Sequence, residues 1–324
     1  MLRAVLVVIV GAFLAWGGYW FVGSRALERA VDDWIVKTPE ARAEALSVRG
    51  FPNRFDVTVT NPVYETAALR WSAPFAQVFS LSYKPNHLLA VFPHDQVLRI
   101  HGVDWAVHSA DMRASLVTRA SADLTLDRAT MVIDALRAQG LGGGDAFQAR
   151  TVRVASRAVE DDPLAHEVGV EVLGLRLPPE VRALLDPAAA LPPELDRLHV
   201  DATVHFDRPL DRMNGAQARA QGIDLRGLSA DWGEIGLRGD GAFDIDDLGQ
   251  ISGEVEATIT NWMQLLDVLR AGGLWDPGMD PMITGLLSGL AREDGDETTL
   301  TLPLSVQRGQ LYLGMFPLGR LPAL

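Results

Sequence analysis

The chain has 324 residues, and 29 Lys and Arg against 42 Asp and Glu give a formal net charge of −13 at pH 7. This acidic balance argues against a nucleic-acid partner, because affinity for the phosphate backbone comes from Lys and Arg. Hydrophobic residues make up 48 % and charged residues 22 %, which excludes a disordered chain and a multi-span membrane protein. The absence of cysteine excludes disulfides, zinc thiolate sites and a cysteine nucleophile.

The first segment is apolar and uncharged from Ala4 to Ser24. Its core, residues 4–22, has 19 residues, and roughly 20 helical residues span the ~30 Å hydrocarbon layer of a bilayer. Aromatic side chains gather at its C-terminal end, as in the aromatic belts of membrane proteins: Trp16, Tyr19, Trp20 and Phe21. We therefore predict a transmembrane anchor over residues 1–23, in the inner membrane. The alternative is a signal peptide cleaved near Ser24-Arg25-Ala26, although signal peptides have shorter apolar stretches.

A helical stem is expected over residues 24–48, because Leu27, Val31, Trp34 and Ile35 recur at helical spacing until Pro39 limits the helix. Its apolar stripe either packs on the domain or contacts a membrane surface or a partner helix. The positive charges that flank the apolar run do not orient it, but long downstream domains translocate largely regardless of charge. We expect the large domain in the periplasm.

Residues 49–324 are predicted to form a β-rich domain, because apolar and polar residues alternate with a period of two. The clearest such segments are residues 55–60, 199–206, 235–245, 251–259 and 300–306. Less regular candidates lie near residues 67–83, 87–100, 103–118, 121–133, 146–159 and 164–177. Strict alternation is typical of antiparallel strands with one solvent-exposed face.

Three short helices are expected in the same domain. One begins near Pro179, one is capped by Asn261 and ends at Gly272-Gly273, and one begins at Asp280-Pro281. The glycine-rich stretch at residues 139–145 is either a boundary between two lobes or a hairpin loop.

The fold class is therefore mainly β (α+β), a long curved antiparallel sheet with a few covering helices after an N-terminal transmembrane helix. Three short helices cannot cover around a dozen strands. The sheet must curl on itself, form two stacked sheets, or leave an apolar trough. The first two arrangements suit a scaffold, and the third suits a lipid-binding site.

Several patterns suggest metal sites and are better explained otherwise. Four histidines recur every seven residues, but an odd spacing alternates faces in a strand, so at most two of them can point together: His87, His94, His101 and His108. The run from Asp244 to Gly249 imitates half of a calcium loop and lacks the carboxylate that closes it, since Val255 stands in its place. We predict a turn there and another, solvated, turn at residues 293–297.

No catalytic, cofactor-binding or metal-binding residue is predicted. The chain has no G-x-S-x-G, H-E-x-x-H or P-loop motif, and the glycines at residues 140–144 lack the strand and helix that a dinucleotide site needs. Four tryptophans are expected in the core or covering the sheet: Trp71, Trp105, Trp232 and Trp275.

The chain resembles a family of uncharacterised, membrane-anchored envelope proteins of Gram-negative bacteria, domain of unknown function twenty-one twenty-five. Four stretches carry the likeness: residues 49–55, 71–78, 82–87 and 309–319, where Met315 and Phe316 depart from the smaller or β-branched residues expected. The resemblance implies a periplasmic location and supplies no reaction and no functional residues.

These observations favour a non-enzymatic envelope protein that binds an acyl chain, a lipid or an envelope protein along its sheet. One alternative is a structural scaffold or assembly factor that pairs with a protein through sheet edges. Another is an envelope hydrolase, which rests only on scattered acids and histidines. No cofactor is expected.

Overall fold

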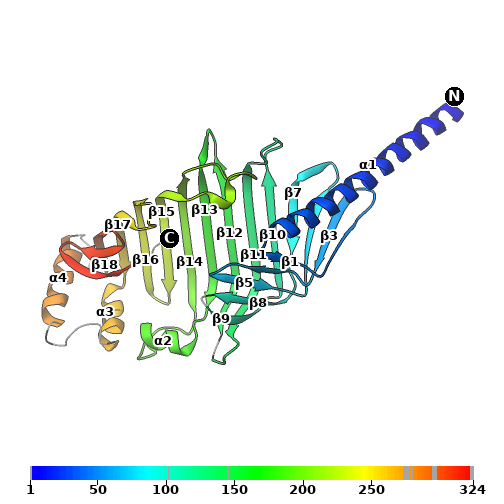
Figure 1. The fold of residues 1–324 in the computed structure, drawn as a ribbon. Coiled ribbons are helices and arrows are strands. Elements are labelled where there is room, and N and C mark those ends of the chain that lie inside the picture. The colour runs from blue at the N-terminus through cyan, green and yellow to red at the C-terminus, as the bar shows by residue number, and fades with distance from the viewer. Residues whose placement is uncertain are drawn as a thin grey trace. The chain divides into compact units, whose positions relative to one another are not determined.

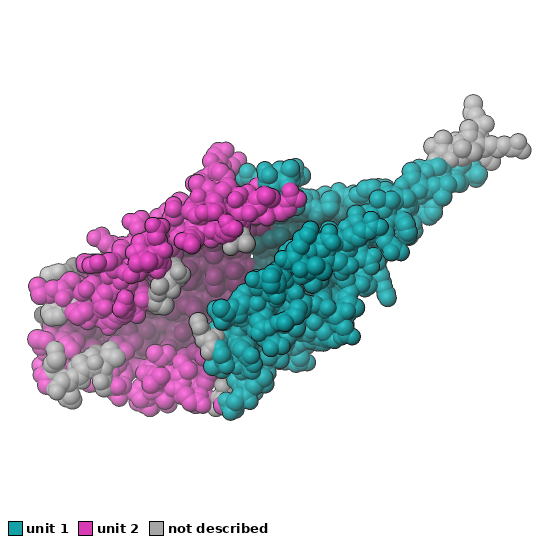
Figure 2. Space-filling view, viewed as in Figure 1, with its two compact units in different colours: residues 1–124, 129–143 teal, residues 125–128, 144–324 magenta. Residues whose placement is uncertain are grey.

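A computed structural model describes residues 2–100, 102–144, 146–272, 278, 280–293 and 298–321. The chain divides into two compact units (Figure 2). Unit 1 comprises residues 1–124 and 129–143, and unit 2 comprises residues 125–128 and 144–324. The division falls at Gly143 and Gly144, inside the glycine-rich stretch.

Unit 1 consists of one long helix and short antiparallel strands (Figure 1). Its elements are α1 (Leu2–Lys37), β1 (Ala41–Arg42), β2 (Ala45–Arg49), β3 (Arg54–Thr60), β4 (Val63–Glu65), β5 (Leu69–Ser72), β6 (Phe75–Leu81), β7 (Lys84–Val91), β8 (Asp95–Ile100), β9 (Val103–His108), β10 (Asp111–Thr118) and most of β11 (Leu126–Gly140). The strands pair in two runs, β2–β3–β6–β7–β10 and β1–β4–β5–β8–β9–β11.

Helix α1 ends at Lys37, so the expected stem over residues 24–48 is wrong beyond that residue. Pro39 provides no N–H for a further helical hydrogen bond and disfavours helical geometry in the residue before it. Residues 41–42 and 45–49 instead form β1 and β2, against which α1 packs. In the part of the chain that the structure describes, no helix combines the length and hydropathy needed to cross a membrane.

Unit 2 is a meander in which each strand pairs antiparallel with the next, from β12 to β20. Its elements are β12 (Phe147–Val159), β13 (Asp162–Leu175), α2 (Pro179–Leu185), β14 (Leu195–Phe206), the 3₁₀ turn η1 (Gly215–Gln217), β15 (Ala220–Trp232), β16 (Ile235–Ile245), β17 (Ile251–Thr260), α3 (Trp262–Ala271), α4 (Asp280–Glu293), β18 (Thr299–Gln307), β19 (Gln310–Leu313) and β20 (Phe316–Arg320). The prediction of a mainly β, antiparallel fold is confirmed.

The alternating segments form β3, β14, β16, β17 and β18, as predicted. Three of the less regular predicted segments each contain two strands. Segments 67–83, 87–100 and 103–118 are divided at Pro74, at Pro93 and at Ser109-Ala110. Strand β15 escaped prediction because a bulge lies at Arg226-Gly227. The bulge shifts the phase of the alternation, which a strict period of two does not tolerate.

The helices of unit 2 begin close to the predicted residues, but Asn261 does not cap α3 through its side chain. Asn261 adopts left-handed backbone angles, with φ of 55°, and its Nδ2 donates to the backbone oxygen of Glu234 at 2.6 Å. Asp280 is the first residue of α4 and accepts a hydrogen bond from Arg270 at 2.8 Å.

Candidate functional site

Four rows of mostly apolar side chains cross unit 2 on one face of the sheet. They arise because every strand alternates and the registers of β12 to β16 match apolar positions with apolar positions. The rows are Val152-Val172-Leu198-Ala230-Leu237, Val154-Val170-Val200-Leu228-Gly239, Ser156-Val168-Ala202-Leu225-Gly241 and Ala158-His166-Val204-Ile223-Phe243. We call this surface the apolar face.

Helices cover the apolar face at one end. Trp262 and Leu266 of α3 and Ala291 of α4 pack against Leu300 of β18, which continues the first row. A second small cluster joins Val268 of α3 to the β16 end of the sheet. Helix packing on the strands of unit 2 is concentrated at β16 and β18.

Over β12 to β15 most side chains of the apolar face are half-buried, whereas Ala202 and His166 are fully buried. Val154 keeps 37 % of its surface exposed, and Val170, Val200 and Leu228 of the same row are only partly buried. Figure 2 shows unit 2 hollowed between its upper and lower margins on the side turned to the viewer. Contiguous apolar surface of this kind marks binding sites, because water is a poor solvent for it.

Two polar side chains interrupt the apolar face at one end. The Oγ of Ser156 and the Nδ1 of His166 are 3.1 Å apart, and the His166 ring meets the edge of Phe206 at a centroid distance of 6.1 Å. His166 is buried, so this pair stabilises the packing of β12 on β13 and is not open to a ligand. Sequence reasoning passed over His166, whose only signal was a histidine at an apolar position of an alternating strand.

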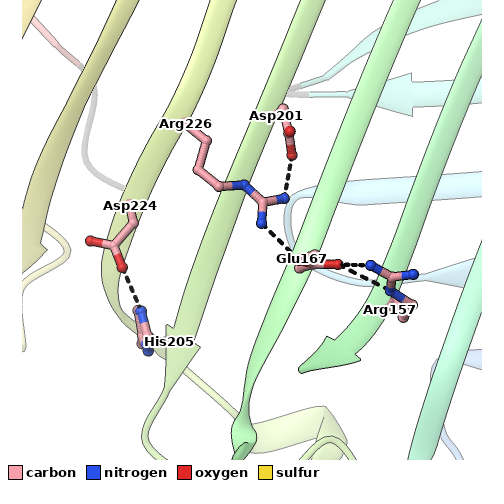
Figure 3. A network of polar contacts seen from close by, with 6 residues as sticks. All are labelled: Arg157, Glu167, Asp201, His205, Asp224 and Arg226. Carbon is pink, nitrogen blue, oxygen red and sulfur yellow. Dashed lines mark hydrogen bonds and ion pairs between the residues drawn. The ribbon is translucent and has the colours of Figure 1, made fainter. Parts of the chain in front are cut away.

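The opposite face of the same strands carries charged side chains, where the apolar face carries mostly aliphatic ones (Figure 3). At the bulge in β15, Arg226 donates to Glu167 at 2.7 Å and to Asp201 at 2.5 Å. Arg157 donates to the other oxygen of Glu167, with its Nε at 3.0 Å. A second cluster has the same arrangement: Arg153 and Arg197 each lie 3.0 Å from Glu171. Together the two clusters connect β12, β13, β14 and β15.

These ion pairs lower carboxyl pKa values. Hydrogen bonds from Arg226 and then Arg157 hold the pKa of Glu167 below its ordinary value. The hydrogen bond from Arg197 has the same effect on the pKa of Glu171, against some opposition from burial. Since these arginines already have carboxylate partners, the charged face clamps neighbouring strands and is a poor site for a further anion.

A buried carboxylate fastens α2 to the loop that follows it. Asp186 accepts hydrogen bonds from the backbone N–H groups of Ala190 at 2.8 Å and Leu191 at 3.0 Å, and from Arg182 at 3.4 Å. Burial alone would raise the pKa of Asp186, but the backbone bonds and Arg182 together outweigh it and lower that pKa. The contacts are internal to the loop, so this carboxylate has a structural role.

The histidines that recur every seven residues are dispersed. His87 lies 3.1 Å from the hydroxyl of Ser115, His94 contacts the backbone oxygen of Ser109 at 2.8 Å, and His108 pairs with Asp95 at 2.8 Å. The rings of His94 and His108 lie 6.4 Å apart, whereas His101 falls outside the described residues. Among the residues that are described, no group of three or more potential ligands could hold a metal ion.

The calcium-like run is a hairpin turn between β16 and β17. Asp246 accepts hydrogen bonds from the backbone N–H groups of Leu248 and Gln250, each at 2.9 Å, as in an Asx turn. Asp294 to Glu297 of the second acidic run lie outside the described residues.

Three of the four predicted core tryptophans can be placed. Trp71 and Trp232 are half-buried and donate from the indole nitrogen, to Gln96 and to the backbone oxygen of Pro192, each at 2.8 Å. Trp105 is half-buried in β9, and Trp275 lies outside the described residues.

Comparison with family models matches residues 20–322 to the family described as "uncharacterized protein conserved in bacteria (DUF2125)". Neither the curated proteins nor the solved structures that were compared contain a match to the chain. The matched span runs from Trp20, inside α1, through both units, and confirms the resemblance carried by the four sequence stretches. The chain belongs to the DUF2125 family of bacterial proteins.

Proposed function

We propose that this protein is a membrane-anchored periplasmic protein that binds the acyl chain of a lipid on the apolar face of unit 2, without catalysing a reaction on it. The observation that carries the proposal is the set of apolar rows over β12 to β15. These rows lie beyond the strands on which α3 and α4 pack.

The dimensions of the apolar face suit an extended hydrocarbon chain. Neighbouring strands lie about 4.8 Å apart, so the row from Val154 to Gly239 extends about 19 Å across five strands. Each buried methylene contributes about 0.8 kcal/mol, so a long acyl chain on this row gains substantial affinity without any polar contact. The valines of the rows offer a smooth surface that discriminates little between chains.

The proposed anchor is the N-terminal part of α1, in the inner membrane. The described apolar side chains there, Leu6, Ile9, Val10, Phe13 and Leu14, are between 48 % and 67 % exposed. A helix that exposes a run of large apolar side chains is stable where lipid covers them. Because the chain has no cysteine, a single cysteine at exposed Ser121, labelled by a membrane-impermeant maleimide in intact spheroplasts, reports the compartment of unit 1.

Site-specific photo-crosslinking in living cells tests lipid binding. Benzoylphenylalanine replaces Val154 or Val200 on the apolar face, and the matched controls carry it at Ala155 or Thr203, on the same strands and the opposite face. We expect lipid adducts, identified by mass spectrometry, at Val154 and Val200 only.

Adducts of a specific protein at the apolar positions, with no lipid, would overturn the proposal in favour of an assembly factor. Equal lipid yields from both faces would also contradict it, since contact with bulk membrane would then explain the adducts. The cysteine at Ser121 separates the question of location from that of binding.

A further inference from the structure

The C-terminal half of the apolar run in α1 contacts the strands and loops of unit 1. The indole nitrogens of Trp16 and Trp20 donate to the backbone oxygens of Pro52 at 3.0 Å and Arg54 at 2.7 Å. The hydroxyl of Tyr19 donates to the backbone oxygen of Ser82 at 2.9 Å. The polar atoms of the predicted aromatic belt therefore bond to the loop between β2 and β3, to the first residue of β3 and to the turn after β6.

Ring contacts fix the same segments along α1. Phe51 meets Phe13 edge-on at a centroid distance of 6.3 Å and Trp20 at 5.4 Å, and Phe55 stacks on Trp20 at 6.0 Å. The backbone oxygen of Asn53 accepts from the N–H of Ser82 at 2.9 Å, which joins the loop to the turn. Residues 50–54 and residues 82–83 thus form one surface against α1, which we call the docking tip.

The contacts determine how deep the docking tip lies. At about 1.5 Å per helical residue, the apolar run 4–22 is about 27 Å long, and the segment from Phe13 to its end accounts for about 14 Å. If the run spans the hydrocarbon layer, which is about 30 Å thick, residues that contact Phe13, Trp16 and Trp20 cannot lie clear of the bilayer. The docking tip must then enter the interfacial layer beside α1, with Phe51, which contacts Phe13, reaching the hydrocarbon.

The side chains of the docking tip suit that layer. Phe51 and Tyr83 remain 48 % and 61 % exposed although they are large and apolar in body. Arg49, Arg54 and Lys84 flank them and are exposed. These residue types suit the boundary between hydrocarbon and phosphate. The ring of Phe51 is wholly apolar, Tyr83 joins an apolar ring to a polar hydroxyl, and lipid phosphates attract Arg and Lys.

We propose that the docking tip is a second membrane contact of this protein, with Tyr83 among the headgroups of the bilayer that holds α1, Phe51 in the hydrocarbon below them, and Arg49 and Lys84 beside lipid phosphates. The inference rests on the proposed anchor. It makes α1 and unit 1 one membrane-bound body, held by a helix and by a loop.

The test uses the full chain in vesicles of phosphatidylethanolamine and phosphatidylglycerol. Single cysteines are placed at Ile9 in α1, at Asn53 in the docking tip and at Val103, an exposed apolar residue in the other strand run of unit 1. Each carries the environment-sensitive fluorophore NBD, and lipids spin-labelled near the headgroup or deep in the chain quench it.

We expect shallow spin labels to quench Asn53 several-fold more strongly than Val103, and Phe51→Ser to reduce the quenching at Asn53 while that at Ile9 persists. Quenching at Ile9 with none at Asn53 would overturn the second contact and leave the anchor intact. Absence of quenching at Ile9 as well would overturn the anchor itself.

Discussion

The exposed position of Val154 on the apolar face allows lipid binding to be separated from folding. In the free protein, a glutamate at this site can reach water, because Val154 is already 37 % exposed in β12. We therefore expect Val154→Glu to change the free energy of unfolding by less than about 1 kcal/mol. Ala155→Glu adds the same charge one residue along, on the opposite face between Arg153 and Arg157.

The effect on binding follows from desolvation. An acyl chain lying on the row of Val154, Val170 and Val200 would cover the new carboxylate with hydrocarbon. Removing an ionised carboxylate from water is unfavourable by several kcal/mol even after relaxation. We take this desolvation penalty as about 3 kcal/mol. Since each 1.4 kcal/mol changes affinity tenfold, the affinity for the acyl chain should fall about 100-fold.

Labelling with a photoactivatable, clickable fatty acid fed to cells measures this loss. Peptides of unit 2 are quantified by mass spectrometry separately from those of α1, which the proposed membrane anchoring would expose to the probe in any case. We expect Val154→Glu to abolish most labelling in unit 2 at limiting probe and Ala155→Glu to leave it unchanged. Unchanged labelling in Val154→Glu, or an equal loss in both variants, would refute the assignment of the apolar face as the lipid site.

Three further predictions concern the stability of unit 2. Asp186→Asn should lower the free energy of unfolding by about 3 kcal/mol, measured by urea denaturation, because it leaves the half-buried Arg182 without its anion. The double variant Glu167→Gln, Glu171→Gln should reduce the loss of thermal stability at acid pH. The pKa values of both glutamates lie below the ordinary 4.5, so the stability that the two carboxylates contribute is complete above that pH and disappears as the pH falls through the lowered values. Leu266→Ala should lower the free energy of unfolding by about 2 to 5 kcal/mol, through the cavity left beneath α3.

Each of these changes has a matched control. Glu180→Gln alters an exposed carboxylate on α2, Glu160→Gln removes an exposed charge beside β12, and Met263→Ala truncates an exposed side chain on α3. All three controls should stay within about 0.5 kcal/mol of the parent protein. A control that is as destabilised as its partner would show that the specific contacts of Asp186, the glutamates or Leu266 are not the cause.

Much of the β architecture can be predicted from local pattern. Residues 200–206, 235–245 and 251–259 alternate because successive side chains of a strand point to opposite faces, and one face of this sheet is apolar. Prolines and glycines then mark most of the strand ends. The same reasoning failed at residues 220–232, because the bulge at Arg226 moves Leu228 onto the face that Leu225 already occupies.

Composition and alternation alone predict an acidic, mainly β, antiparallel chain with more apolar strand surface than three short helices can cover. Whether that surface would close, stack or stay open depended on register and on where α3 and α4 pack, and these are contacts between residues far apart in the chain. The aromatic residues of α1 show the same limit: their spacing is typical of a membrane belt, but their partners at Pro52, Arg54 and Ser82 exist only once β2, β3 and β6 have come together. Periodicity reports which side chains avoid water, and only the tertiary structure decides what covers them.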